Sequence, residues 1–188
     1  MTKTALLFIQ GGGEGAYDED KKLAVFLADN LKDQYKIEYP RMPDEGNPNY
    51  ETYKAKILEE LKKIDTKVVL VGHSVGGCFL LKYLSEEKID NQITGIFLIA
   101  TPFWGKEGWQ HEGFRLSRDF AQKLPVETPM FFYHGTDDET VPFSHLALYE
   151  KELPRARFRK IAGRGHQLDN DLAEVVQDIR SVSNNIPG

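Results

Sequence analysis

The sequence predicts an α/β fold built on one parallel sheet. Its 188 residues alternate six short apolar runs with amphipathic segments of helical period. Such alternation is typical of a parallel sheet with helices on both faces, because each parallel strand needs a long crossover to return to the same edge. The length and the 40% hydrophobic content suffice for one core of this kind rather than two.

The period of each segment places the elements in order along the chain. Strands are expected over residues 4–9, 36–40, 67–71, 94–100, 129–133 and 157–161. Helices are expected over residues 19–32, 50–64, 75–86, 142–151 and 169–181. These units are expected to be joined by right-handed crossovers, and the expected strand order of the sheet is 2-1-3-4-5-6. The basic stretch 155–160 is then expected to be a solvated edge of the sheet.

The motif Gly72-His73-Ser74-Val75-Gly76 directly follows the third apolar run. A strand that turns at once into a helix holds its central residue in a strained conformation, and glycines on either side leave room for that turn. Ser74 is therefore a candidate nucleophile at the carboxyl edge of the sheet. The alternative is a glycine-rich turn in which the serine only caps the helix.

A candidate triad acid follows the fifth predicted strand, in the segment HGTDDETVP at residues 134–142. A carboxylate on this loop lies at the same sheet edge as the candidate nucleophile. We favour Asp138 over Asp137 and Glu139, because the Asp-x-x-Val-Pro spacing lets Pro142 anchor the loop. The alternative is that the acidic cluster only begins the next helix.

The candidate base is His166, in the segment GRGHQLD at residues 163–169, after the last predicted strand. Glycines on both sides of Arg164 make a tight loop from which the histidine can reach back over the sheet edge. A lone loop histidine is more often surface decoration or a helix cap. The chain order Ser, Asp, His favours a catalytic role here.

These segments together resemble the α/β-hydrolase superfamily, and the chain is similar in size and layout to the small serine hydrolases that include retinoblastoma-binding protein 9. The resemblance rests on LLFIQGGGEG, VVLVGHSVGG, HGTDDETVP and GRGHQ in that order, and it covers essentially the whole chain. It implies an α/β-hydrolase fold with Ser74 as nucleophile, Asp138 as acid and His166 as base. Gln10 departs from the pattern, since larger members often have histidine there, and most of their usual cap domain is missing.

The glycine stretch from Gln10 to Gly15 is interpreted as an oxyanion loop. It lacks the Gly-Lys-Ser/Thr ending of a phosphate loop and the glycine spacing of a dinucleotide site. Acyl transfer places negative charge on a carbonyl oxygen, which two backbone N–H groups must stabilise. Val75 is expected to supply one N–H and Gly12 the other, with the choice among Gly11 to Gly13 left open.

The segment at residues 101–124 has no strand period, and four of its aromatic side chains are candidate pocket residues. We expect it to be a lid-like part of a single domain spanning residues 1–188, because it follows the strand after the nucleophile. These four side chains would line an apolar acyl or alcohol pocket over Ser74. They are Phe103, Trp104, Trp109 and Phe114. The alternative for each of them is packing of the segment onto the sheet.

The charge and composition exclude several classes of partner. A net charge of -5 and a pI near 5.6 give no electrostatic reason to bind nucleic acid or an anionic membrane. No apolar run is long enough for a membrane span or a signal-peptide core, so a cytoplasmic location is the default expectation. The single Cys78 allows no intramolecular disulfide and is expected to be buried. The other histidines, with His111 and His145 expected at the surface, lack the spacing of a zinc site, so neither a metal nor a cofactor is expected.

The sequence thus predicts a carboxylesterase-like serine hydrolase that acts on a small ester or acyl substrate through an acyl-enzyme. An acyltransferase or a peptidase fits the same motifs, because they do not distinguish water, alcohol and amine acceptors. A non-catalytic binding protein on the same fold is a third possibility, since a fold does not guarantee an activity. Protein partners and the natural substrate stay open.

Overall fold

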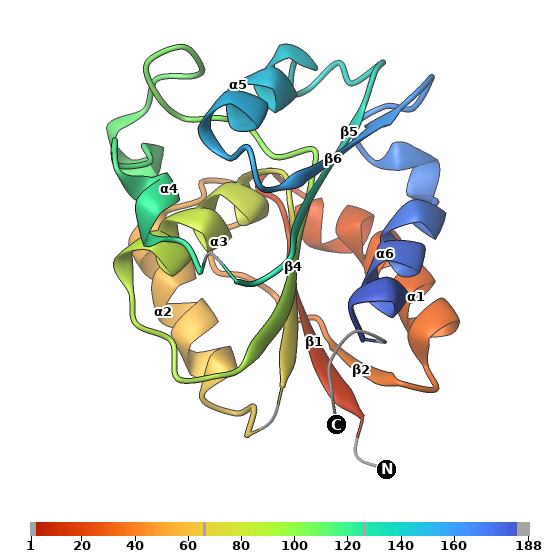
Figure 1. Ribbon diagram of the computed structural model, residues 1–188. Helices are drawn as coiled ribbons and strands as arrows, with labels where there is room; N and C mark the ends of the chain where they lie inside the picture. The colour runs from red at the N-terminus through yellow and green to blue at the C-terminus, as the bar shows by residue number, and fades with distance from the viewer. Residues whose placement is uncertain (1–2, 66, 126, 184–188) are drawn as a thin grey trace.

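A computed structural model describes residues 3–65, 67–125 and 127–183 of the chain (Figure 1). Its framework is a six-stranded sheet in the order β2-β1-β3-β4-β5-β6, and every neighbouring pair of strands is parallel. The predicted strand order is therefore confirmed. The strands are β1 (Thr4–Ile9), β2 (Tyr35–Glu38), β3 (Val68–His73), β4 (Ile93–Ile99), β5 (Met130–Gly135) and β6 (Arg157–Ile161).

Helices cover both faces of this sheet. Helices α1 and α6 lie on one face, and α2, α3, α4 and α5 lie on the other (Figure 1). Their bounds are α1 (Ala16–Leu31), α2 (Tyr50–Leu61), α3 (Val75–Glu86), α4 (Phe120–Lys123), α5 (Ser144–Glu152) and α6 (Ala173–Ser183), with short 3-10 turns η1 (Glu112–Phe114) and η2 (Leu168–Asn170). In the part of the chain that the structure describes, no helix is both long and apolar enough to cross a bilayer.

The two faces of the sheet follow from the alternation of side chains along each strand. In β1, Leu6 and Phe8 pack toward α1 and α6, whereas Leu7 and Ile9 pack toward α2 and α3. All four side chains are fully buried. A strand covered on both faces needs apolar residues at every position, which explains the continuous apolar runs of the sequence.

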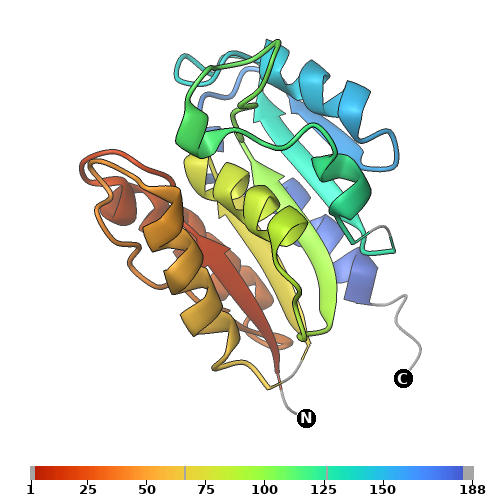
Figure 2. The ribbon, with the colours of Figure 1, turned by 90° about the vertical axis from the view of Figure 1, so that its left-hand side faces the viewer.

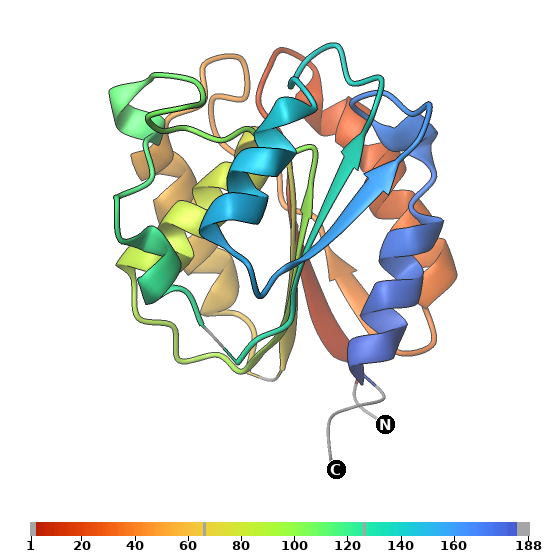
Figure 3. The same cartoon turned by 45° about the horizontal axis from the view of Figure 1, so that its top comes forward.

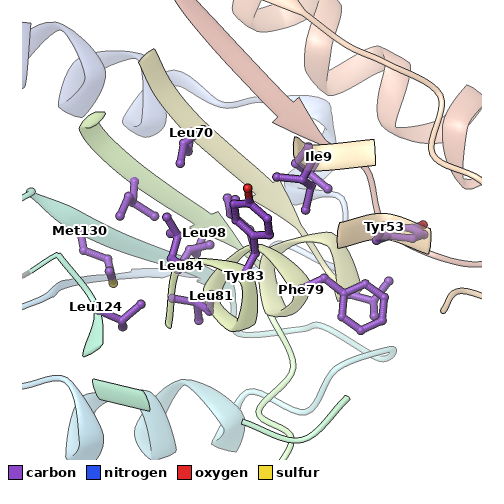
Figure 4. Close-up of a cluster of buried hydrophobic side chains, with 14 of the residues drawn as sticks. Ile9, Tyr53, Leu70, Phe79, Leu81, Tyr83, Leu84, Leu98, Leu124 and Met130 are labelled. Carbon is purple, nitrogen blue, oxygen red and sulfur yellow. The ribbon is translucent and has the colours of Figure 1, made fainter. Parts of the chain in front are cut away.

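Helix α3 occupies the centre of one of these two cores. Its side chain Leu84 lies near Leu98 of β4, and Phe79 points toward Tyr53 of α2 (Figure 4). Because the helix is buried against the sheet and against α2, its amino-terminal end is held firmly at the carboxyl edge of the sheet. That edge is where the loops after the strands gather (Figure 3).

Most predicted bounds agree with the structure to within two or three residues, and α6 is the main exception. The helix expected from residue 169 begins at Ala173, because η2 comes first. Leu168, Asp169 and Asn170 have φ values of 46°, 56° and 58°, a left-handed turn that no periodic pattern signals. Strand β6 lies at the edge of the sheet with Arg157, Arg159 and Lys160 exposed, as the basic stretch predicted.

Candidate active site

Ser74 stands at the turn between β3 and α3. Its φ of 52° and ψ of -129° place it in a region that residues other than glycine rarely adopt. The turn needs glycine on both sides, since a Cβ on Gly72 would lie 2.5 Å from Gly77 Cα, and one on Gly76 would overlap the carbonyl oxygens of Ile9 and Gln10. The Ser74 side chain makes no capping hydrogen bond to α3, so the interpretation of this serine as a helix cap is wrong.

Asp138 and His166 come together across the same edge of the sheet. Asp138 lies in the loop after β5 and His166 in the loop after β6, and His166 Nδ1 donates to Asp138 Oδ2 at 2.8 Å. The ring centroid of His166 lies 4.8 Å from that of His73, the residue before Ser74. The hydrogen bonds of the described residues join His166 to Asp138 but not to Ser74. The three candidates thus share one edge, with two of them already bonded.

Three hydrogen bonds and one further imidazole contact converge on the Asp138 carboxylate. Oδ1 accepts from the backbone N–H groups of Thr140 (2.9 Å) and Val141 (2.8 Å), and Oδ2 accepts from His166. His134 Nε2 donates to the Val141 carbonyl oxygen at 2.9 Å and lies 3.2 Å from Asp138 Oδ2. Burial works to raise the pKa of Asp138, but the contacts with His134 and His166 outweigh it and hold the pKa well below the usual value. Asp138 is therefore a fixed, ionised acceptor.

The competing carboxylates Asp137 and Glu139 are both exposed. Asp137 accepts a hydrogen bond from the Thr136 hydroxyl beside it. Helix α5 begins at Ser144 without a side-chain cap, so the acidic cluster does not begin that helix. The structure therefore places Asp138 alone, among these three carboxylates, against His166.

The Asp138 bond sets the tautomer of His166. Because Nδ1 carries the proton that is donated to the carboxylate, the neutral ring leaves Nε2 free to accept a proton. Burial lowers the pKa of His166 below its ordinary value of 6.5, the bond to Asp138 opposes that effect, and the nearby charge of His73 adds to it. The ring is thus neutral, and able to act as a base, near neutral pH.

The backbone N–H groups of the glycine loop after β1 are divided among different acceptors. Gly11 donates to Asp20 Oδ2 at 2.7 Å, and Gly13 donates to the carbonyl oxygen of Glu45. The hydrogen bonds of the described residues include none from the Gly12 N–H. A Cβ on Gly12 would lie 2.9 Å from Val75 Cγ1, so this glycine packs directly against the first residue of α3.

Gln10 stands where larger members of the superfamily often have histidine. It is fully buried, its Oε1 accepts from the Met42 N–H at 3.0 Å, and its Nε2 donates to Glu45 Oε2 at 3.0 Å. Glu45 Oε2 also accepts from the Tyr17 N–H at 2.7 Å. These bonds hold the glycine loop between β1, α1 and the chain before α2.

A second acid and imidazole pair lies beside this site and was not predicted from the sequence. His73 Nδ1 lies 2.9 Å from Asp20 Oδ2, and both side chains are almost completely buried. His73 Nε2 donates to the carbonyl oxygen of His166 at 3.1 Å, and Gln167 Nε2 donates to Asp20 Oδ1 at 2.9 Å. A signal existed: Asp20 falls on the apolar stripe of α1, in register with Leu23, Ala24 and Leu27.

His145 corrects a prediction, because it is 5% exposed rather than a surface residue. Its Nδ1 accepts from the Phe103 N–H at 2.9 Å, and Trp109 covers the ring at a centroid distance of 5.0 Å. Burial lowers its pKa. His111 is exposed as expected, and Cys78 is buried.

The four candidate pocket residues of segment 101–124 pack in two ways. Phe103 is buried and packs edge-on against Tyr149 of α5, at 5.0 Å between ring centroids. Trp104 lies between Trp109 and Phe114, at 5.1 Å and 4.9 Å, and Phe114 contacts Phe79 of α3. The segment lies next to α3 (Figure 2). Packing onto the core thus describes Phe103 and Phe114, and Phe114 also forms an aromatic cluster above α3 with Trp104 and Trp109.

A cavity of about 540 Å³ opens beside this segment, and Phe103 and Trp104 are among its lining residues. Charged side chains make up much of the remaining wall, including Lys106, Glu107 and Arg115. Ser74 and His166 do not line it. This cavity therefore does not represent the pocket that the sequence predicted over Ser74.

Within the described ranges no group of three or more metal-binding side chains gathers.

Many solved structures have the same fold, among them three that are 20% identical to this chain or less. The ydeN gene product from B. subtilis superposes with a TM-score of 0.77 at 20% identity, covering 98% of this chain and 100% of that one. A variant of the meta-cleavage product hydrolase CumD also gives 0.77, at 14% identity, covering 98% and 92% of the two chains. Est1E from Butyrivibrio proteoclasticus gives 0.71 at 19% identity, covering 97% and 88%. A search of curated protein sequences found no match.

The family model named "Serine hydrolase" matches residues 22–172 of the chain. That match spans β2 to β6 and includes Ser74, Asp138 and His166. The structural neighbours have the same fold as this chain, the α/β-hydrolase fold that the sequence motifs predicted. The chain belongs to the serine hydrolase family.

Proposed function

We propose that this protein hydrolyses small ester or acyl substrates with Ser74 as nucleophile, His166 as general base and Asp138 as the acid that orients the base. The proposal rests above all on the 2.8 Å bond from His166 Nδ1 to Asp138, formed at the edge where Ser74 is held in a strained turn. That bond leaves Nε2 as the basic nitrogen, which is the tautomer that a Ser-His-Asp triad requires.

In the proposed reaction His166 Nε2 takes the hydroxyl proton as Ser74 Oγ attacks the substrate carbonyl carbon. The tetrahedral intermediate collapses, and the alcohol leaves with that proton, so that an acyl-enzyme remains. Water then attacks the acyl carbon while Nε2 takes a proton from it. Collapse of the second intermediate releases the carboxylic acid and returns the proton to Ser74.

The oxyanion is proposed to bind the N–H groups of Gly12 and Val75. The hydrogen bonds of the glycine loop support Gly12 as the donor, because the Gly11 and Gly13 N–H groups are already bonded to Asp20 and Glu45. Val75 is the first residue of α3, where helix N–H groups have no partner within the helix and the dipole is positive. Each donor of this kind typically contributes about 3 kcal/mol to transition-state stabilisation.

The carboxylesterase-like part of the proposal draws on the aromatic cluster of Trp104, Trp109 and Phe114. Cys78, one helical turn after Ser74, donates its thiol to the Phe114 carbonyl at 3.7 Å, which brings the cluster over the first turn of α3. We propose that these rings contact a short acyl or alcohol group of the substrate. Phe103 is buried, and its carbonyl oxygen accepts the Trp109 N–H at 3.0 Å, which ties the cluster to the core.

Steady-state hydrolysis of p-nitrophenyl acetate by wild type and Ser74→Ala tests the reaction. Turnover should fall by roughly four to six orders of magnitude, because the triad acts as a unit. Ser144→Ala, at the exposed start of α5, is the matched control and should keep wild-type turnover. A Ser74→Ala enzyme that retains most of its activity refutes the proposal. Product analysis with added alcohol and amine separates hydrolysis from acyl transfer.

A series of p-nitrophenyl esters from acetate to octanoate tests the aromatic contacts. Replacing Trp109 and Phe114 by Ala should change the preferred chain length, since both rings are proposed to bound the acyl group. Replacing the exposed Lys106 by Ala is the control and should leave the preference as it is. An unchanged preference in the aromatic variants contradicts this part of the proposal.

A further inference from the structure

Asp20 and His73 connect two loops that the proposed reaction depends on. Asp20 Oδ2 accepts the Gly11 N–H at 2.7 Å, so the pair holds the glycine loop after β1. His73 Nε2 donates to the His166 carbonyl oxygen at 3.1 Å, and Asp20 Oδ1 accepts from Gln167 at 2.9 Å, so the pair also holds the loop after β6. Ser74 lies between these loops. A Cβ added at Gly11 would lie only 3.1 Å from Ser74 Cβ, so the glycine loop packs directly against Ser74.

The hydrogen bonds of His73 define where its protons must be. A carbonyl oxygen only accepts, so Nε2 carries a proton. The contact between Nδ1 and Asp20 Oδ2 needs one further proton, while Asp20 also accepts from Gly11 and Gln167. A neutral Asp20 would place that proton on the carboxyl and leave the imidazole neutral. An ionised Asp20 would leave that proton on His73 Nδ1, so that the two side chains form an ion pair.

The surroundings favour the ion pair. Burial lowers the pKa of His73, but the charge and hydrogen bond of Asp20 outweigh it and raise the pKa above 6.5. Burial raises the pKa of Asp20, but His73 and the Gly11 N–H outweigh it and lower the pKa below 3.8. The other ionisable groups near the pair are His166 and Asp138 at the site, with Tyr39 and Tyr53, whose pKa values are raised by burial.

We infer that Asp20 and His73 form a buried, charged positioning pair for the proposed reaction. The pair holds the glycine loop after β1, which contains Gly12, and the loop after β6, which contains His166, on opposite sides of Ser74. Neither residue contacts the reacting atoms, and both act through the groups they hold. This inference rests on the proposed function of Ser74, Asp138 and His166.

The charge of the pair also bears on His166. The His73 cation disfavours a second positive charge on the neighbouring ring, at a centroid distance of 4.8 Å, and this effect is larger than the opposite one from Asp20. Removing the pair's charges should therefore raise the pKa of His166. A pair without net charges on its two side chains would leave this pKa where it is.

Ester hydrolysis by Asp20→Asn tests the positioning role. The amide keeps the shape of the side chain but removes the charge that holds His73 protonated. We expect kcat to fall about 10- to 100-fold with KM changed less than about 3-fold, because misplaced catalytic groups lower the rate of the chemical step more than binding. The acid limb of kcat/KM should move to higher pH. Asp29→Asn, on the exposed face of α1, is the matched control and should match wild type in both measurements.

Nitrogen-15 NMR of the histidine rings, recorded on Ser74→Ala protein, gives a second measurement that does not depend on activity. It should show His73 with protons on both nitrogens at pH 7 while His166 is neutral. Wild-type kcat and an unmoved acid limb in folded Asp20→Asn overturn the inference, and so does a neutral His73. If Asp20→Asn does not fold, the NMR result alone decides. Absent turnover by wild type itself contradicts the proposed function instead.

Discussion

At Asp138 a single carboxylate receives two backbone N–H groups and two imidazoles. The backbone donors come from Thr140 and Val141, so the loop that carries the acid also aims it. An Asp-x-x-Val-Pro spacing places a rigid residue just after this turn, which is why the sequence favoured this acid over its neighbours. The bonds of Asp20 to His73 and Gln167 could not be predicted in this way, because these partners come from distant parts of the chain.

Replacing Asp138 with Asn should lower kcat roughly 10³- to 10⁴-fold. The amide can turn its NH₂ group toward His166, which then holds the proton on Nε2 and loses its basic nitrogen. Asp137→Asn, one residue away and exposed, is the matched control and should retain wild-type kcat. Equal losses in the two variants, measured with p-nitrophenyl acetate, would contradict the choice of acid.

The pH dependence of kcat/KM should report the ionisation of His166. Burial lowers its pKa below 6.5, and the base works only when neutral, so activity should rise with pH and reach half its plateau below pH 6.5. The groups that face this ring are Asp138, His73 and Asp20. A half-point above pH 6.5 in the wild-type profile would mean that the pKa of His166 is raised rather than lowered.

At the scale of elements, β3 and α3 form the unit that presents Ser74. Sequence period gave α3 its observed bounds, yet it ended the strand at residue 71, two residues before β3 ends at His73. Glycine at position 72 has low strand propensity, and the strand continues to the turn because Gly72 pairs with β1 and β4 and His73 pairs with β4. Helix α6 begins later than predicted because the left-handed residues of η2 precede it, and such a turn has no periodic signal in the sequence.

Gly76→Ala should disrupt this unit. The new methyl group would overlap the backbone oxygens of Ile9 and Gln10, which cannot turn aside, so the start of α3 must move away from β1. We expect a loss of about 1–3 kcal/mol in the free energy of unfolding and a fall in kcat. Urea unfolding followed by the ester assay measures both.

Gly113→Ala provides the control for this substitution. Gly113 lies in η1 and is exposed, and its new Cβ would meet only the His111 ring at 3.5 Å, an ordinary contact. Its stability and kcat should match wild type. A Gly76→Ala protein as stable and active as Gly113→Ala would show that the packing of α3 on β1 does not constrain Ser74.

For the whole molecule, every local signal of the sequence agrees with one parallel sheet, which is why its strand order was predictable. The same arrangement brings the loops after β1, β3, β5 and β6 to one edge (Figure 3). The sequence pattern could not predict which side chains connect these loops to one another. His145 shows this, since its exposure depends on Trp109 and Phe103, which come from a segment without regular period.

The buried pair of Asp20 and His73 should make global stability depend on pH. Asp20 has a lowered pKa, so its contribution is present above about pH 3.8 and is lost as the pH falls. His73 has a raised pKa, so its contribution is complete below pH 6.5 and is lost as the pH rises through the folded-state pKa. The difference in unfolding free energy between wild type and Asp20→Asn should therefore be largest between these two values.

Urea unfolding of both proteins at a series of pH values measures this difference. Asp29→Asn supplies the baseline for loss of one exposed carboxylate from the same helix. A difference that stays constant from pH 4 to pH 9 would contradict the ion pair.

The most direct test of the central claim is to label the folded protein with a fluorophosphonate probe and locate the adduct by tandem mass spectrometry. The probe reacts with a serine that a neighbouring base has activated, so we predict one adduct, on Ser74, and none on Ser74→Ala protein. Folded wild-type protein that takes up no probe, or an adduct on another residue that persists in Ser74→Ala, would contradict the assignment of Ser74 as the nucleophile.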